Sequence, residues 1–240
     1  MFPQTRLSVV ERLGSADAAQ RQLAWDALVA AYWRPVYRYL RARWRLTPET
    51  AEDLTQDFFA RAIAKGFLES YDPSRARFRT WLRTGVDGVA SHAQEAAGRL
   101  KRGGGVITVP LDFTTAEGDI CDVPLEADVD LDAWFHHEFV RSLFMRAVDA
   151  LRADYEGRGR ASHLELFEAY DLSDLREDDR PSYKALAEAR GWAIHDVTNR
   201  LAATRRDFRA HVLRLLHEAC ASDEEYQREA RNLFGLNRLT

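Results

Sequence analysis

The sequence predicts an all-α protein with two helical domains joined by an acidic linker. Apolar residues recur at helical spacing in two long blocks, and helix start and stop signals punctuate both blocks. About 26 residues of acidic chain, interrupted by Gly and Pro, separate the blocks, which is long for a loop inside a compact domain. With 240 residues, 46% of them apolar, the chain can bury one large core or two small ones. The expected organisation is a first domain at 1–105, a linker at 106–132, a second domain at 133–220 and a C-terminal helical extension at 221–240.

Three helices are expected in the first block, at about 15–40, 48–65 and 77–102. Ser15 is the expected cap of the first helix, and Pro35 is expected to break or restart it. Thr47, Pro48 and Glu49 begin the second helix with an N-cap hydroxyl, a proline at the first helical position and an acid at the positive end of the helix dipole. The first domain is therefore predicted to be a bundle of amphipathic helices.

Five further helices are expected, at about 132–157, 162–170, 182–190, 193–217 and from 222 onward. Ser162 and Glu165 have the spacing of a capping box, and Ser222 supplies a hydroxyl cap for the last helix. Gly191 joins the helices expected at 182–190 and 193–217. The only candidate strand in the sequence is the short apolar run at 106–109.

Charge is strongly segregated along the chain, although the net charge is only −4. Residues 32–45 hold five arginines and no acid, whereas residues 111–138 hold nine acids and no Lys or Arg. Residues 71–102 carry seven bases against three acids, and residues 200–214 carry five arginines against one acid. Genome composition explains the preference for Arg over Lys but not its clustering. Basic and acidic surfaces are therefore expected on different parts of the molecule.

Residues 181–209 carry the most specific local signal. Ala187, Gly191 and Val197 have the spacing of a helix-turn-helix, with a small residue where two helices cross, a glycine in the turn and an apolar anchor on the second helix. The expected inward face of that helix is Ile194, Val197, Leu201, Phe208 and Val212. The expected outward face is His195, Thr198, Asn199, Ala202, Arg206 and Arg209, which suits a DNA major groove. The alternative is a plain amphipathic helix in a bundle.

The sequence predicts no catalytic residue, no cofactor and no metal site. The run from His136 to Glu138 lacks the spacing of a zinc helix, and His217 with Cys220 supplies only half of a metal site. Cys121 and Cys220 form no disulfide framework, and no glycine loop suits a phosphate. No apolar run is long enough for a membrane span or a signal peptide, so a cytoplasmic protein is expected.

Three linked motifs carry a family resemblance. The stretch from Trp25 to Arg102, with YWRPVYRYLRAR, TAEDLTQDFFARAI and YDPSRARFRTWLRTGV, resembles region 2 of a bacterial RNA polymerase sigma factor of the extracytoplasmic-function type. Residues 182–209 resemble region 4 of the same family. The glycine turn after 102, the acidic linker and the C-terminal helix resemble a branch with extended linkers and tails. The resemblance implies a non-enzymatic factor that binds core RNA polymerase, recognises promoter DNA and helps to melt the start site.

The resemblance also implies functional residues. The side chains expected to dock on a coiled coil of the largest polymerase subunit are Glu52, Asp53, Gln56 and Asp57. Those expected to contact promoter DNA are Arg75, Arg77, Arg79, Thr80, Arg83, Thr84, His195, Thr198, Asn199, Arg200, Arg205 and Arg206. Phe78 and Trp81 are assigned to packing rather than to base stacking.

Several features depart from the family pattern or leave alternatives open. Gly88 falls where the family often has a polar residue, and Ala193 replaces the expected helix cap. Thr50 stands where the family often has an acid, and phosphorylation there would restore the charge, so the expected partners extend to an anti-sigma regulator or a protein kinase. The acidic linker could lie in a basic polymerase channel, fold back on the protein's own arginines or serve as a solvated spacer. The alternative functions are a helix-turn-helix regulator that acts without polymerase and a helical protein-binding adaptor.

Overall fold

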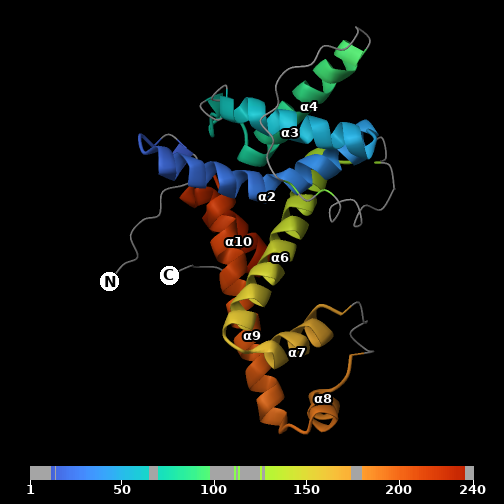
Figure 1. Cartoon of the computed structure of the whole chain (residues 1–240), viewed down its shortest axis with the longest axis vertical. Coiled ribbons are helices and arrows are strands. Elements are labelled where there is room, and N and C mark those ends of the chain that lie inside the picture. The colour runs from blue at the N-terminus through green and yellow to red at the C-terminus, as the bar shows by residue number, and fades with distance from the viewer. Residues whose placement is uncertain are drawn as a thin grey trace. The chain divides into compact units, whose positions relative to one another are not determined.

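The structure is a computed structural model, and it describes residues 12–13, 15–64, 70–97, 111, 113, 125, 128–173 and 180–235. Within these residues there are eight helices and no strand, so the predicted all-α class is confirmed (Figure 1). The candidate strand at 106–109 lies outside the described residues. No helix in the described part of the chain is long and apolar enough to cross a membrane.

The chain divides into two compact units, one of residues 1–142 with 216–240 and the other of residues 143–215. The helices are α2 (Ala18–Trp44), α3 (Pro48–Ala64), α4 (Phe78–Ala97), α6 (Leu131–Gly157), α7 (Ala161–Asp171), α8 (Tyr183–Arg190), α9 (Ile194–Ala219) and α10 (Asp223–Phe234). Unit 1 contains α2, α3, α4, α10 and the first part of α6. Unit 2 contains the rest of α6, α7, α8 and most of α9. The domain boundaries expected from the sequence stay predictions.

The first helix differs from the sequence prediction at two points. Asp17 is its N-cap and accepts a hydrogen bond from the Ala19 amide, whereas Ser15 accepts from the Asp17 amide outside the helix. Pro35 does not interrupt α2, which continues to Trp44. A proline in a helix interior removes one backbone hydrogen bond and costs about 3 kcal/mol. Packing offsets this cost, because nearly every residue from 31 to 40, Pro35 included, is buried.

The next two helices follow the prediction closely. α3 begins at Pro48 after the Thr47 hydroxyl, which accepts a 3.4 Å hydrogen bond from the Thr50 amide. α4 begins at Phe78, close to the predicted start at 77, and buries one apolar side that includes Leu82 and Val86. The predicted C-terminal end of α3 at Lys65 and that of α4 near Arg102 lie outside the described residues.

Aromatic side chains build the core of unit 1. Tyr32 of α2 is fully buried, stacks on Phe139 of α6 and meets Phe78 of α4 edge to face. Phe113, from the predicted linker, is also buried, with its ring 5.4 Å from that of Trp33 and 5.1 Å from that of Tyr37. This residue of the predicted linker is therefore packed rather than solvated.

Unit 2 has a separate core between its four helices. Its buried members are Leu151, Tyr155, Leu164, Leu166, Phe167, Leu186, Ala187, Val197 and Leu201. The predicted capping box at the start of α7 is wrong. Arg160 is the N-cap and no side chain caps the helix, because Ser162 lies within it and accepts a 2.7 Å hydrogen bond from Arg200 instead.

Candidate nucleic-acid interface

A turn and the start of α4 place the first group of predicted DNA contacts in unit 1. Asp72 accepts hydrogen bonds from the Ser74 amide and hydroxyl, which lower the pKa of its carboxyl group and fix the turn. Arg75 and Arg77 follow this turn and are exposed. Tyr71 packs its ring against Phe78, which is fully buried as the packing assignment required. The turn therefore presents the two cationic side chains of Arg75 and Arg77 next to the packed rings of Tyr71 and Phe78.

Arg79 lies differently from its two exposed neighbours. Its side chain is only 8% exposed, and it forms a 3.1 Å ion pair with Glu229 of α10, whose side chain is 5% exposed. The guanidinium carbon also lies 3.9 Å from the centre of the Phe139 ring, which is cation–π contact. Burial acts to lower the pKa of Arg79, but Tyr32 and Glu229 raise it overall. Arg79 is thus a charged group held inside unit 1 in this arrangement.

Arg83 lies one turn further along α4 and sits between two carboxylates. Its Nε donates to Asp132 at 2.6 Å, and its Nη1 donates to Asp87 at 2.8 Å. Asp87 also accepts from the Tyr39 hydroxyl and from the Trp44 indole, both at 2.9 Å. Burial raises the pKa of Tyr39 to about 12, so it stays a neutral donor. Asp87 therefore joins the end of α2 to the middle of α4.

The two threonines predicted to contact bases lie on the same helix. Thr84 is exposed, and its hydroxyl donates to the Thr80 carbonyl at 2.8 Å. Thr80 is half-buried and lines a cavity of about 340 Å³ together with Arg77 and Arg79. Both hydroxyl groups keep acceptor capacity for a further ligand.

In unit 2, α8 and α9 meet at a tight turn. Ser182 caps α8 by accepting from the Ala185 amide, and Gly191 ends it in the left-handed conformation at φ 65°. Ala193 has no side chain that could cap α9, but the Asp196 carboxylate in the first turn accepts from the Ala193 amide at 3.3 Å, which is the reciprocal half of a capping box. Ala187 and Val197 are buried on either side of the turn, as the helix-turn-helix spacing requires.

The outward face of α9 agrees with the sequence over most of its length. His195, Thr198, Asn199, Ala202 and Arg206 are exposed, as predicted, whereas Arg209 is half-buried. Ile194 was predicted to face inward, but it is 51% exposed. It is the first residue of α9, where the neighbouring turn leaves it outside the core that begins at Val197.

The remaining two predicted contacts on α9 already have partners. Arg200 donates to the Ser162 hydroxyl at 2.7 Å and lies over the Trp192 ring at 4.2 Å. Arg205 forms two hydrogen bonds to the Asp171 carboxylate, at 2.8 and 2.9 Å, which raise its pKa. These arginines attach α9 to the rest of unit 2.

The predicted polymerase-binding residues lie together on α3. Asp53 is exposed, Glu52 and Gln56 are partly exposed, and Asp57 forms a 2.7 Å ion pair with Arg61 one turn later. The buried side of the helix carries Ala51, Thr55, Phe58, Phe59 and Ala62. The opposite surface is acidic near the helix N-terminus, where acids are favoured by the dipole.

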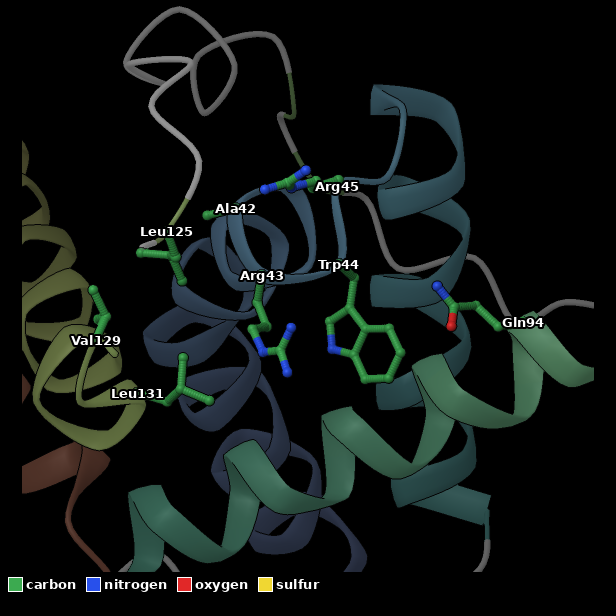
Figure 2. Close-up of a pocket in the computed structure, with 8 residues that line it drawn as sticks. All are labelled: Ala42, Arg43, Trp44, Arg45, Gln94, Leu125, Val129 and Leu131. Carbon is green, nitrogen blue, oxygen red and sulfur yellow. The ribbon is translucent and has the colours of Figure 1, made fainter. Parts of the chain in front are cut away.

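A larger cavity, of about 540 Å³, lies where α2 ends. Figure 2 shows Arg43 and Trp44 pointing from α2 toward α4, with Gln94 of α4 on one side and Leu131 on the other. None of the residues predicted to contact DNA lines this cavity. Within the described residues, no group of three His, Cys, Asp or Glu side chains could hold a metal ion.

The segment that contains most of α2 and all of α3 and α4 matches a known protein family. Residues 28–99 match the Sigma-70 region 2 family. The match begins within α2 and includes α3 and α4, so it contains the acidic surface of α3 and all of the predicted DNA contacts in unit 1. It supports a sigma factor, a non-enzymatic factor of transcription initiation, and implies sigma-factor-like RNA polymerase binding and promoter melting. No curated protein and no solved structure was found to match the chain.

Sequence reasoning missed the acids that hold the region 2 arginines. Glu229 pairs with Arg79 across 150 positions of sequence, and Asp132 bonds to Arg83 across 49. No local pattern predicts such pairs, because each acid is an ordinary member of an amphipathic helix and its partner lies far away in the sequence. The only available signal was the segregation of charge, which implies that acidic and basic segments can meet.

Proposed function

We propose that the protein is a sigma factor of the extracytoplasmic-function type that binds core RNA polymerase, recognises promoter DNA and helps to melt the start site. The region 2 match carries this proposal, since it spans the helices on which the predicted polymerase and promoter contacts lie. Neither activity needs a catalytic residue or a cofactor of the protein's own. The protein would act in the cytoplasm, where the polymerase works.

The α3 surface supports the polymerase contact. Glu52, Asp53 and Gln56 form an acidic and amide-bearing strip away from the buried side of the helix. Such a strip suits a basic surface, with charge setting mainly the rate and register of association. Asp57 belongs to the same strip, but it forms an ion pair with Arg61.

Two separate surfaces support the promoter contact. In unit 1, the exposed Arg75 and Arg77 supply charge for a DNA backbone, and Thr84 supplies a hydroxyl for a base edge. In unit 2, Asn199 and Arg206 are exposed on α9, and their side chains suit the role of a recognition helix, as in region 4. A factor that opens DNA needs both single-strand and duplex contacts.

Regulation by another protein is part of the proposal. Thr50 is exposed at the third residue of α3, with its hydroxyl 3.0 Å from that of Thr47. A phosphate there would add negative charge beside Glu52 and Asp53 near a helix N-terminus, which favours anions. A kinase or an anti-sigma regulator therefore remains a predicted partner.

A helix-turn-helix regulator that works without polymerase is the second candidate. The α8–α9 pair, with its short turn at Gly191 and exposed polar face, favours it. That function gives no reason for a region 2 domain, whereas the sigma factor accounts for both units. A helical protein-binding adaptor accounts for neither set of arginines.

Association with bacterial core RNA polymerase tests the proposal. The full chain should copurify with the core enzyme, and the Glu52→Arg, Asp53→Arg double variant should bind it about tenfold more weakly or worse. The matched control reverses Glu156 and Glu165, which are exposed in unit 2 and outside region 2. Failure of the wild-type chain to bind polymerase would favour the regulator. Equal loss in the two variants would reject the α3 assignment.

A further inference from the structure

The C-terminal helix α10 lies against the region 2 surface that carries predicted promoter contacts. It is outside the matched residues 28–99, yet it belongs to the same compact unit. The segment before it is attached to α2, since the Tyr32 hydroxyl donates to the Ala219 carbonyl at 3.1 Å. Glu229 of α10 then reaches Arg79 of α4 in the buried ion pair described above.

A second acid from outside region 2 binds Arg83, the next arginine along α4. Arg79 and Arg83 are four residues apart and so share one face of α4. Asp132, the second residue of α6, accepts a 2.6 Å hydrogen bond from Arg83. Carboxylates and phosphates bind a guanidinium in the same planar geometry. Glu229 and Asp132 therefore occupy the positions that DNA phosphates would take on these two arginines.

The space between these elements is also acidic. The cavity of about 340 Å³ that Arg77, Arg79 and Thr80 line is also lined by Asp130, Asp132, Glu225 and Glu229. His136 lies there too, 3.8 Å from Glu229, and its pKa is lowered by burial and by Arg79, so it adds little positive charge at neutral pH. A nucleic-acid strand brought to this side of α4 would meet four carboxylates at close range. Like charges at such distances oppose binding.

The contact is built so that it can be exchanged. Arg79 Nε, Arg79 Nη2 and Glu229 Oε2 are buried without a hydrogen-bond partner among the described residues. An incompletely bonded buried ion pair gains little over its desolvation cost. The helix itself is complete without its neighbours, since Ser222 caps its start and Gly235 its end. Its release from α4 therefore breaks no capping hydrogen bond, and because a free helix of 12 residues is only marginally stable, its amides exchange faster once it has left.

We propose that α10, together with Asp132, is an intramolecular inhibitor that covers the promoter-facing side of region 2 and must leave before Arg79 and Arg83 can bind single-stranded promoter DNA. This inference rests on the proposed function. It assigns the C-terminal extension a role as a competitor for the DNA surface.

Charge-neutral variants of the two acids test the competition. The Glu229→Gln, Asp132→Asn variant of the full chain keeps the size of both side chains and should bind a fluorescein-labelled single strand of about 20 nucleotides roughly tenfold tighter at low salt. The control, Glu156→Gln with Glu165→Gln, makes the same change in net charge on exposed positions of unit 2. Adding Arg79→Gln to the first variant should remove most of the gain. Equal gains in variant and control, or no gain in the variant, would overturn the proposal.

A measurement on the wild-type chain covers the case in which the variant does not fold. Saturating amounts of the same single strand should make the backbone amides of residues 223–234 exchange faster with deuterium, while those of α3 stay unchanged. Unchanged or slower exchange in α10 would show that the helix stays in place and would reject the inference. Polymerase association of the same proteins keeps the two proposals apart, because it depends on α3 and survives the loss of inhibition.

Discussion

Arg38 of α2 and Glu138 of α6 form a 2.7 Å ion pair in which neither side chain is more than 9% exposed. The pair lies within unit 1 and joins the helix at the start of region 2 to a helix outside it. A buried charge whose partner is removed keeps its desolvation cost without compensation. The pair therefore stabilises the contact between α2 and α6 only while neither charge is left without the other.

Removing one charge of this pair should be far more damaging than removing both. We expect Glu138→Gln to lower the free energy of unfolding of unit 1 by about 3–5 kcal/mol, because the Arg38 guanidinium stays buried and loses the negative charge of Glu138. The double variant Arg38→Met, Glu138→Leu should recover most of that loss, since two apolar side chains need no counterion. Urea denaturation followed by circular dichroism measures both. Equal losses in the single and double variants would contradict this account.

The ion pair between Arg38 and Glu138 shows which parts of the structure the sequence predicts and which it does not. Helix ends with local signals were predictable: Thr47, Ser182, Gly191 and Ser222 each act within four residues of their own position. Ion pairs such as Arg38 with Glu138 join residues 100 positions apart, and nothing in the local sequence of either partner selects the other.

The wrong predictions failed for a related reason. Pro35 lies inside α2 because tertiary packing around it outweighs the lost backbone bond. Ser162 has the local signature of a cap, but Arg200 from another helix takes its hydroxyl. The exposed site residues were easier to predict than the buried Arg79, because an exposed face follows from helix periodicity, whereas burial of a cation requires knowledge of the acid that meets it.

One substitution made at two glycines should give opposite results. Gly191 has φ 65°, so Gly191→Ala forces an alanine into the left-handed region and should cost unit 2 about 1 kcal/mol. Gly88 lies within α4 with open space where a Cβ would stand, so Gly88→Ala should stabilise unit 1 by about 0.5–1 kcal/mol through its higher helix propensity. Thermal unfolding of the two variants measures both shifts. A shift of the same sign in both would contradict the assigned backbone conformations.

The stability of unit 2 should fall in mild acid because of His163. Burial, together with the nearby Arg200 and Arg160, lowers the pKa of His163 in the folded state. The unfolded chain, with a His pKa of about 6.5, then takes up the proton first as the pH falls. The free energy of unfolding of unit 2 therefore falls as the pH drops below about 6.5, with a slope of at most about 1.4 kcal/mol per pH unit from this group.

Urea denaturation at several pH values between about 7.5 and 5 measures this effect. His163→Gln removes the titrating group, so its unfolding free energy should fall less steeply with acid than that of the wild-type chain. The difference between the two curves isolates His163 from the other acids and histidines. Parallel curves would show that the protonation of His163 is not linked to folding.

The exposed face of α9 should separate base reading from phosphate anchoring. Asn199 is exposed and has the amide needed for a bidentate contact with adenine, so Asn199→Ala should cost about 1–3 kcal/mol at one promoter position and relax the preference there. The Arg206 side chain is 74% exposed and lies 3.3 Å from Asp207, so Arg206→Ala should weaken binding to all promoter sequences alike and flatten the salt dependence. Arg205→Ala serves as a structural comparison for these two variants.

Asp171 and Tyr183 already accept hydrogen bonds from the Arg205 side chain, so its loss should lower the stability of unit 2 as well as DNA binding. Polymerase reconstituted with each variant, assayed on single-base variants of a promoter selected from a random library, distinguishes the three effects. If Asn199→Ala and Arg206→Ala bind and discriminate like the parent, α9 is a bundle helix and does not read the promoter.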